Sequence, residues 1–311
     1  MTSAATSPNA RLMERAREIK GRSLWQDARR RLFANKAAVA SMFILGIIAL
    51  MAIFADHLSP FGYADINYDM IACAPDWWPD KTVACFATPD HLFGTDSNGR
   101  DLFVRVLYGA RVSLAVGVVA TFVSLLIGVI YGATAGFLGG RVDNLMMRVV
   151  DVLYSLPFIF FVIILMVVFN RNFILMFVAI GAVEWLTMAR IVRGQTLSIR
   201  RKDFIEAAEA AGVSRLAIIR RHIVPNVVGP VIVYVTLLIP SVILAESFLS
   251  FLGLGVQEPL TSWGVLISDG ANEMETKAWM LIFPATFMAV TLFCFNFIGD
   301  GLRDALDPKD R

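Results

Sequence analysis

The sequence predicts an all-α polytopic membrane protein with six transmembrane helices. Of its 311 residues, 57% are hydrophobic and only 17% are charged, and the mean hydropathy is +0.65. Soluble domains carry roughly 25% charged residues, so this composition argues against a soluble enzyme, a nucleic-acid-binding protein and a disordered linker. The second observation is a series of apolar stretches, each close to the roughly 20 residues that a helix needs to cross a bilayer.

The apolar stretches divide the chain into spans and loops. The six expected spans cover residues 37–55, 113–138, 149–169, 172–191, 227–245 and 278–298. Only Asn170 and Arg171 separate the third span from the fourth, which predicts a tight hairpin. The expected units are a cytoplasmic segment (1–36), a first span (37–55), an external loop (56–112), a transmembrane core (113–298) and a cytoplasmic tail (299–311). Within the core, residues 200–225 form a cytoplasmic loop and residues 246–277 an external segment.

The basic residues predict the orientation. In this arrangement, 22 of the 28 lysines and arginines lie on the side of the two termini. Loops rich in lysine and arginine stay in the cytoplasm, so we expect both termini there. The net charge of +2 is too small to indicate a polyanionic partner.

The segment before the first span predicts an interfacial helix. Residues 23–36 combine apolar side chains such as Trp25 and Leu32 with a run of arginines, which is typical of an amphipathic helix at a membrane surface. A cleavable signal peptide is the competing interpretation. It is disfavoured because Ile53 stands where a small residue is needed before a cut at Ala55.

The external loop holds two of the three cysteines. Cys73 and Cys85 lie where an oxidising compartment permits pairing, and we expect a disulfide that closes the loop. Further along is a turn-rich polar stretch, in which the candidate residues are Gly94, Thr95, Asp96, Gly99, Arg100 and Asp101. Its side chains can satisfy backbone amides, so the stretch either shapes the loop or contacts a partner protein.

Small residues and prolines mark the later spans. Four glycines from Gly128 to Gly140 recur every four residues, which predicts close packing of one helical face. Pro230 and Pro240 lie in the fifth span and predict a kink. Residues 248–255 are too short to span the bilayer and too apolar to lie free in water, which predicts a re-entrant or interfacial helix.

Glu184 is the one ionisable residue well inside an expected span. A charge in hydrocarbon is costly unless it is paired or functional. Glu184 is therefore either a carboxylate satisfied by a neighbour in the helical bundle or a group with a role in transport. Asp151, Glu246 and Asp300 lie near span ends and are expected to reach the interface.

The sequence lacks the usual signatures of catalysis. No Gly-Lys dipeptide occurs, so the chain has no phosphate-binding P-loop, and any ATP must be used by a partner. The histidines His57, His91 and His222 lie in different segments, which disfavours a zinc hydrolase. There is also no Gly-x-Ser-x-Gly nucleophile elbow. We expect no catalytic residue, metal site or cofactor in this chain.

The loop over residues 200–225 carries the strongest functional pattern. Asp203, followed three residues later by Glu206, is typical of a capping box at the start of a helix. Gly212 suits the left-handed residue that ends such a helix, and Ser214 can cap a second short helix. The loop is therefore predicted to be a compact helix–turn–helix.

This loop resembles the EAA loop of ABC importer membrane subunits. The residues that carry the resemblance are Glu206, Ala207, Ala208, Gly212 and Pro225. In that family the loop forms a coupling helix that docks in a cleft of a cytoplasmic ATPase, so the resemblance implies ATPase contact by these residues. The family ending Ile-x-Leu-Pro is replaced here by residues 222–225, in which only the proline agrees.

Other segments resemble dipeptide and oligopeptide permease subunits, and the similarity covers roughly residues 22–311. The segments are residues 94–101, 109–114, 248–264 and 296–308. The resemblance is to the C-type subunit of oligopeptide importers, and it implies a type I ABC importer permease (MetI-like) fold in a bacterial inner membrane. The implied partners are a second, nonidentical permease subunit, two cytoplasmic ATPases that bind ATP and Mg²⁺, an external binding protein and a peptide substrate. The alternative is a proton-coupled secondary transporter that uses Glu184.

Overall fold

The computed structural model describes residues 24–80, 82–168 and 173–306. Apart from two isolated β-bridges in the external loop, the regular elements of these ranges are helical. The expected hairpin at Asn170 and Arg171 and the two ends of the chain lie outside the described residues.

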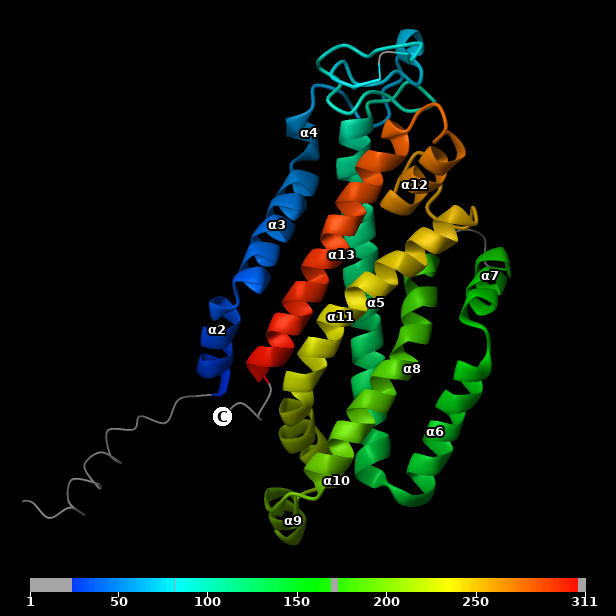
Figure 1. Ribbon diagram of the computed structural model, residues 1–311. Helices are drawn as coiled ribbons and strands as arrows, with labels where there is room; N and C mark the ends of the chain where they lie inside the picture. The colour runs from blue at the N-terminus through cyan, green and yellow to red at the C-terminus, as the bar shows by residue number, and fades with distance from the viewer. Residues whose placement is uncertain (1–23, 81, 169–172, 307–311) are drawn as a thin grey trace, which may run out of the picture.

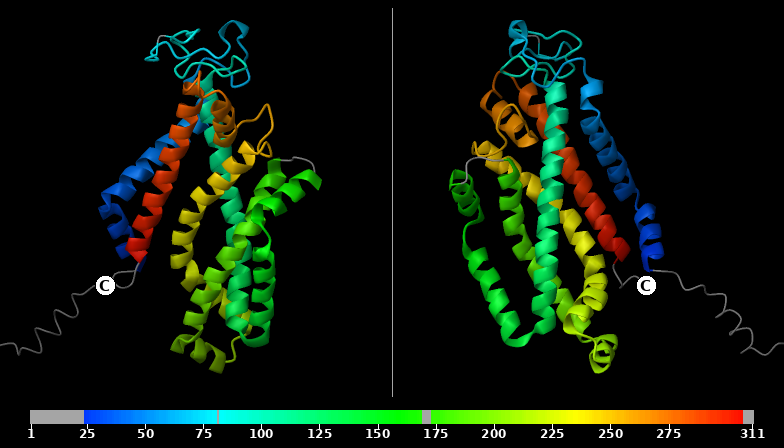
Figure 2. Two further views of the ribbon diagram at one scale, coloured as in Figure 1. Left: turned by 45° about the vertical axis from the view of Figure 1, so that its right-hand side comes forward. Right: turned by 180° about the vertical axis from the view of Figure 1, so that it is seen from behind.

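The first helices form a continuous arm. Helix α2 (Leu24–Ala34) is the amphipathic helix expected over residues 23–36, and α3 (Lys36–Ile53) is the first span. Asn35 separates them, and its side-chain oxygen accepts from Ala37 N and Ala38 N, which satisfies the free amides at the start of α3. The short helix α4 (Ala55–Leu58) follows. The arm lies beside the carboxyl-terminal helix α13 (Trp279–Leu306) in both views (Figures 1 and 2).

The long helix α5 (Leu102–Leu138) begins 11 residues before the expected second span. Asp101 caps it by accepting from Val104 N at 2.8 Å. Its first turns are buried under the external loop, where Arg105 is 1% exposed. Several other helices contact α5, and the most extensive contact is with α8 (Phe173–Arg200).

The expected third span is broken. Helix α6 (Gly140–Ser155) ends before Pro157, and α7 (Phe158–Val168) continues in a new direction. Leu156 is extended, with φ −74° and ψ 132°, because a residue before proline avoids the helical conformation and proline lacks an amide donor. The bend between Gly140–Ser155 and Phe160–Val168 is 83°.

Four helices in the described ranges are long and apolar enough to cross a membrane. They are Lys36–Ile53, Leu102–Leu138, Arg215–Phe251 and Trp279–Leu306. The bent pair of α6 and α7 raises the number to five if it is counted as one span. The fold is therefore all-α with four to five apolar helices of membrane-spanning length, and the expected count of six is not confirmed.

The loop over residues 200–225 and the expected fifth span form a series of connected helices. It consists of α9 (Asp203–Ala210), α10 (Arg215–Ile218), the π-helical turn η2 (Ile219–Ile223) and α11 (Val224–Phe251). Helix α11 runs through Pro230 and Pro240 as one helix. Its last turn contains Phe248–Phe251, so the separate helix expected over residues 248–255 does not form. The short helix on this side is instead α12 (Trp263–Asn272).

The predicted glycine face packs α5 against α8. A β-carbon added to Gly132 would overlap the carbonyl oxygen of Ala189, and one added to Gly136 would lie 2.9 Å from the carbonyl oxygen of Arg193. Gly140 does not share this role, because it begins α6 and a β-carbon there would have no neighbour within 4 Å. The close approach therefore ends at Gly136.

Candidate functional site

The structure has two candidate functional regions at opposite ends of the helical bundle. Helix α9 projects at one end, and the external loop, which contains the short turn η1 (Tyr68–Met70), lies at the other (Figure 1). Among the described residues, no group of three histidine, cysteine or acidic side chains is arranged to hold a metal ion.

Helix α9 is anchored on one side and exposed on the other. Ile205 is 1% exposed and belongs to the main hydrophobic core, whereas Glu206 and Ala207 are exposed. Two large apolar side chains, Phe204 and Leu216, are also exposed, by 43% and 76%. Sequence reasoning did not single out these two residues, although apolar residues in a basic loop were a readable signal for protein contact.

The ends of α9 differ from the expected capping box. Lys202 occupies the N-cap position, with φ −89° and ψ 142°, and makes no side-chain cap. Asp203 is the first helical residue, where its charge still favours the positive end of the helix dipole. Gly212 has φ +74°, the left-handed conformation that was predicted. Ser214 stands at the N-cap of α10, but its side chain makes no capping hydrogen bond.

Pro225 lies in the first turn of α11. Because proline has no amide hydrogen, the carbonyl group four residues earlier loses its usual helical donor. The preceding turn is a π-helix, in which Val224 N donates to Ile219 O. This turn joins α10 to α11 without a loop between them.

The polar stretch at residues 94–101 is a closed structure that is buried except at Ser97 and Asn98. Asp96 accepts from Arg100 N at 2.9 Å and from Arg100 Nε at 2.8 Å, and its Oδ2 lies 3.1 Å from Arg105 Nε. Arg100 also pairs with Glu258 at 3.0 Å, which ties this stretch to the segment before α12. Gly94 and Gly99 both have positive φ, and a β-carbon at Gly99 would overlap a backbone carbonyl oxygen.

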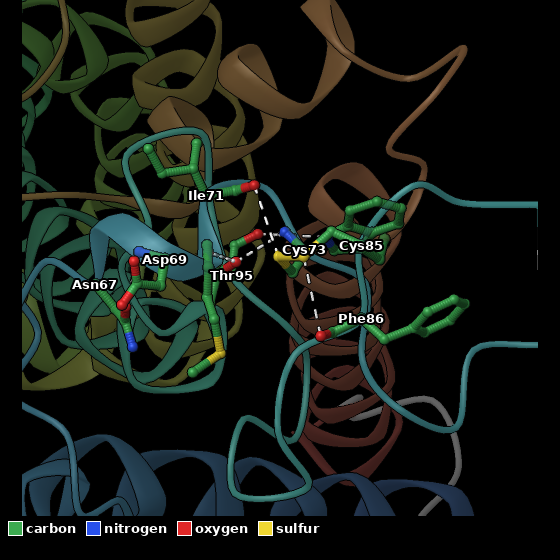
Figure 3. The surroundings of a disulfide bond; sticks show 9 residues. Asn67, Asp69, Ile71, Cys73, Cys85, Phe86 and Thr95 are labelled. Carbon is green, nitrogen blue, oxygen red and sulfur yellow. Dashed lines mark hydrogen bonds between the residues drawn. A yellow bond between two sulfur atoms is a disulfide. The ribbon is translucent and has the colours of Figure 1, made fainter.

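Thr95 and Asp101 continue this scaffold. Thr95 Oγ1 accepts from Cys73 N at 2.9 Å, beside the disulfide that joins Cys73 and Cys85 with a Cα–Cα distance of 4.7 Å (Figure 3). Asp101 pairs with His91 Nδ1 at 2.8 Å. Burial raises the pKa of Asp101, and its hydrogen bonds oppose that shift. Because Thr95, Asp96, Arg100 and Asp101 are all less than 8% exposed, their geometry favours the first of the two expected roles, shaping the loop.

Glu184 lines a cavity beside the break between α6 and α7. Among the described residues it forms no ion pair with the basic end of α8. There, Arg190 contacts Asp151 at 2.8 Å and Arg193 contacts Asp143 at 2.6 Å. Asp151 therefore forms an ion pair across α6 and α8 rather than only reaching the interface.

Glu246 was expected at the interface, but it is fully buried. Its Oε1 accepts from Ser250 Oγ and from Ser262 Oγ, each at 2.7 Å. Ser262 also caps α12 by accepting from Val265 N. The next residue, Trp263, donates its backbone amide to Ser113 of α5 at 3.1 Å. A buried carboxylate thus joins α11 to α12, close to α5.

Comparisons with known proteins give matches over most of the chain. Residues 102–311 match the family model described as "Binding-protein-dependent transport system inner membrane component". Residues 23–75 match the "N-terminal TM domain of oligopeptide transport permease C".

Two relatives and one solved structure illustrate the similarity. The chain is 60% identical over 294 residues to the oligopeptide transport system permease protein OppC of Escherichia coli (strain K12), with 94% of each chain covered. It is 45% identical to the OppC protein of Bacillus subtilis (strain 168), with 94% of this chain and 92% of the relative covered. A structure of the MetNI methionine ABC transporter in an inward-facing conformation matches with a TM-score of 0.54 and 19% identity, over 66% of this chain and 97% of that chain. This last likeness shows a shared MetI-like fold, and the relatives give no support to a proton-coupled transporter.

Proposed function

Because this chain belongs to the family of binding-protein-dependent transport system inner membrane components, we propose that it is the C-type permease subunit of an ATP-driven importer of oligopeptides. It is a transport subunit, and ATP hydrolysis takes place in separate partner subunits. The oligopeptide cargo is inferred from the permeases named OppC that share up to 60% identity with it. The observation that carries the mechanism is α9, an anchored helix whose outer face is exposed at one end of the bundle.

The proposed assembly contains two nonidentical permease subunits, two cytoplasmic ATPases and one external binding protein. Each permease subunit supplies half of the pathway through six spans, with both of its termini in the cytoplasm of a bacterial cell. ATP and Mg²⁺ bind in the ATPases. The binding protein docks on exposed residues of the 56–112 and 246–277 regions, such as Ser97 and Asn98, which the buried 94–101 scaffold holds in place.

Helix α9 is suited to transmit the movement of an ATPase. Glu206, Ala207 and Gly212 would face the ATPase cleft, with exposed Phe204 beside them supplying apolar contact. Ile205 fixes α9 in the core, so a push on the helix moves its neighbours rather than bending the loop. Since Arg215–Phe251 is one helical run of 37 residues, the push reaches the external end of α11 directly.

Recovery of partner proteins tests this function. The subunit is isolated by affinity from gently solubilised native membranes, with Gly212→Asp as the variant and Gly253→Asp as its matched control. Both glycines have φ +74° with no neighbour within 4 Å of an added β-carbon, and a residue with a β-carbon in that conformation costs roughly 1–2 kcal/mol. The two variants therefore carry the same strain at opposite ends of the molecule.

We expect the wild type and Gly253→Asp to recover a second permease subunit and the ATPases. Gly212→Asp should recover about tenfold less ATPase, which corresponds to a loss of roughly 1.4 kcal/mol in binding free energy, and it should keep the second permease subunit. Isolation of the wild-type chain alone or as a homodimer would remove the basis of the proposal. Equal ATPase recovery in both variants would exclude Gly212 from the contact.

A further inference from the structure

The cavity at the break between α6 and α7 has no part in the coupling mechanism. It has a volume of about 380 Å³ and is lined by residues 153–157 at the end of α6 and by Val183, Glu184 and Thr187 of α8. Sites for small ligands span roughly 300–1,000 Å³. The cavity therefore suits one end of a peptide rather than a whole oligopeptide.

The basic residues nearest to this cavity along α8 are already paired. Arg193 binds both carboxylate oxygens of Asp143, at 2.6 and 2.7 Å. Arg190 Nη2 lies 2.8 Å from Asp151 Oδ1. Both aspartates belong to α6, so these contacts neutralise the facing charges of the two helices on the side toward α9. The Arg190 guanidinium also lies over the ring of Tyr154, which lines the cavity, at 4.3 Å from the ring centroid. Within the described residues, neither arginine forms an ion pair with Glu184.

Glu184 is a half-buried carboxylate that faces the cavity. Within the ranges 24–80, 82–168 and 173–306, no side chain forms an ion pair or a hydrogen bond with it. An ionised carboxylate at membrane depth is costly unless water or a cation reaches it. The open cavity provides this access, and the carboxylate gives the cavity a negative charge.

Two neighbouring features also favour a cation. Helix α6 ends at Ser155, and the end of a helix carries the negative end of its dipole. Two of the last carbonyl oxygens already accept hydrogen bonds, Val152 O from Ser155 Oγ and Leu153 O from Leu156 N. Tyr234 of α11 lies within electrostatic range of Glu184. Helix α11, which packs against α8, is thus close to this carboxylate.

We propose that Glu184 binds the amino-terminal ammonium group of a peptide in transit. This inference rests on the proposed function, since it takes the cargo to be a peptide. Every unmodified peptide carries that ammonium group whatever its side chains are. A single carboxylate therefore serves peptides of many sequences, and the partial exposure of Glu184 allows water to replace the peptide at release.

Uptake by the complete importer complex in proteoliposomes tests this site. Saturating binding protein is loaded with a tripeptide that has no ionisable side chain. Glu184→Gln removes the charge and keeps the shape, Glu184→Asp keeps the charge, and Asp304→Asn removes an exposed carboxylate at the end of α13 as the matched control. Uptake is measured per ATP hydrolysed, as a function of the concentration of loaded binding protein.

We expect Glu184→Gln to lower the maximal uptake per ATP about tenfold, the size of one lost charge-assisted contact. Glu184→Asp should retain most of the uptake, and Asp304→Asn should match the wild type. The concentration of loaded binding protein at half-maximal uptake should be the same in all four complexes, because the cavity is not part of the external docking face.

Four other results are informative. Uptake by Glu184→Gln within about twofold of the wild type would overturn the inference. A loss confined to lysine-containing peptides would assign the carboxylate to a side-chain ammonium group and overturn the amino-terminal assignment. Failure of Glu184→Gln to assemble with the second permease subunit would show that Glu184 pairs with that subunit instead. If the wild-type complex moves no peptide at all, the proposed function itself fails.

Discussion

Glu246 helps to hold the end of the bundle at which α12 lies. Its carboxylate accepts hydrogen bonds from the hydroxyl groups of Ser250, on its own helix, and of Ser262, at the start of α12. Ser262 in turn caps α12, and the neighbouring Trp263 is 0% exposed and donates its indole N–H to Val106 O of α5. Glu246 therefore links α12 to α11, while Trp263 links α12 to α5.

Removal of that acceptor should destabilise the subunit. Glu246→Ala removes the acceptor of the hydroxyl hydrogens of Ser250 and Ser262, and a buried donor left unsatisfied costs roughly 1–3 kcal/mol. We expect a loss of about 2–4 kcal/mol in the free energy of unfolding, seen as a lower thermal midpoint of the detergent-solubilised protein. Glu246→Gln still offers one side-chain oxygen as an acceptor, so its free energy of unfolding should fall less.

Glu275→Ala is the control, because Glu275 is exposed on the same side of the molecule. It should leave the thermal midpoint unchanged. If Glu246→Ala melts at the same temperature as this control, the hydrogen bonds of Glu246 do not hold α12 in place.

Helices α5 and α8 approach each other closely at glycine residues. Gly128, Gly132 and Gly136 of α5 and Gly181 of α8 all lie where a β-carbon would come within 3.0 Å of the other helix. Small residues at such spacing let helix backbones approach closely in a membrane, where packing contributes strongly to association.

Gly132→Ala should separate these two helices. Its β-carbon would overlap the carbonyl oxygen of Ala189, a backbone atom that cannot rotate away, and would lie 2.9 Å from Val192 Cβ. Overpacking of this kind costs about 1–3 kcal/mol, and the thermal midpoint should fall accordingly. Gly46→Ala on α3 is the matched control, since a β-carbon there has no neighbour within 4 Å, and it should not lower the midpoint. A Gly132→Ala protein as stable as that control would show that the helices adjust freely.

The sequence allowed prediction of the apolar helices and of the turn at Gly212, because hydropathy and left-handed glycines are local signals. It did not allow prediction of where α5 begins. Arg105 and Arg111 read as loop residues, but Arg105 pairs with Asp96, and Arg111 donates to Ile53 O and Asp56 at 2.9 and 2.8 Å. The contacts of Arg111 join segments more than 50 residues apart in the chain, and only the folded structure brings them together.

The same distinction holds for the break in the third span and for Glu246. Pro157 is a local signal, since proline disfavours a helix on its amino-terminal side, and the apolar run of residues 149–169 masked it. The burial of Glu246 depends on Ser262, which is 16 positions away in the chain. Spacing within one helix could not reveal that partner.

The molecule as a whole places its two candidate regions at opposite ends of the helices (Figure 2). The external loop is closed by the disulfide and by the buried Asp96 pairs, whereas α9 is held by Ile205 and the continuous helix that follows it. An importer requires such a separation, because its binding protein and its ATPases work on different sides of the membrane. The proposed orientation puts α9 in the cytoplasm, where the basic residues of its loop favour it.

The cysteine content makes that orientation directly testable. Cys73 and Cys85 are joined, and Cys294 is buried, so the wild-type chain should react little with a membrane-impermeant maleimide. Ser214→Cys beside α9 and Thr276→Cys before α13 each place one thiol at an exposed position. We expect Thr276→Cys to react in intact spheroplasts and Ser214→Cys to react only after the membrane is disrupted. The reverse pattern would invert the topology, and labelling of both variants in intact spheroplasts would contradict the separation of the two regions by the bilayer.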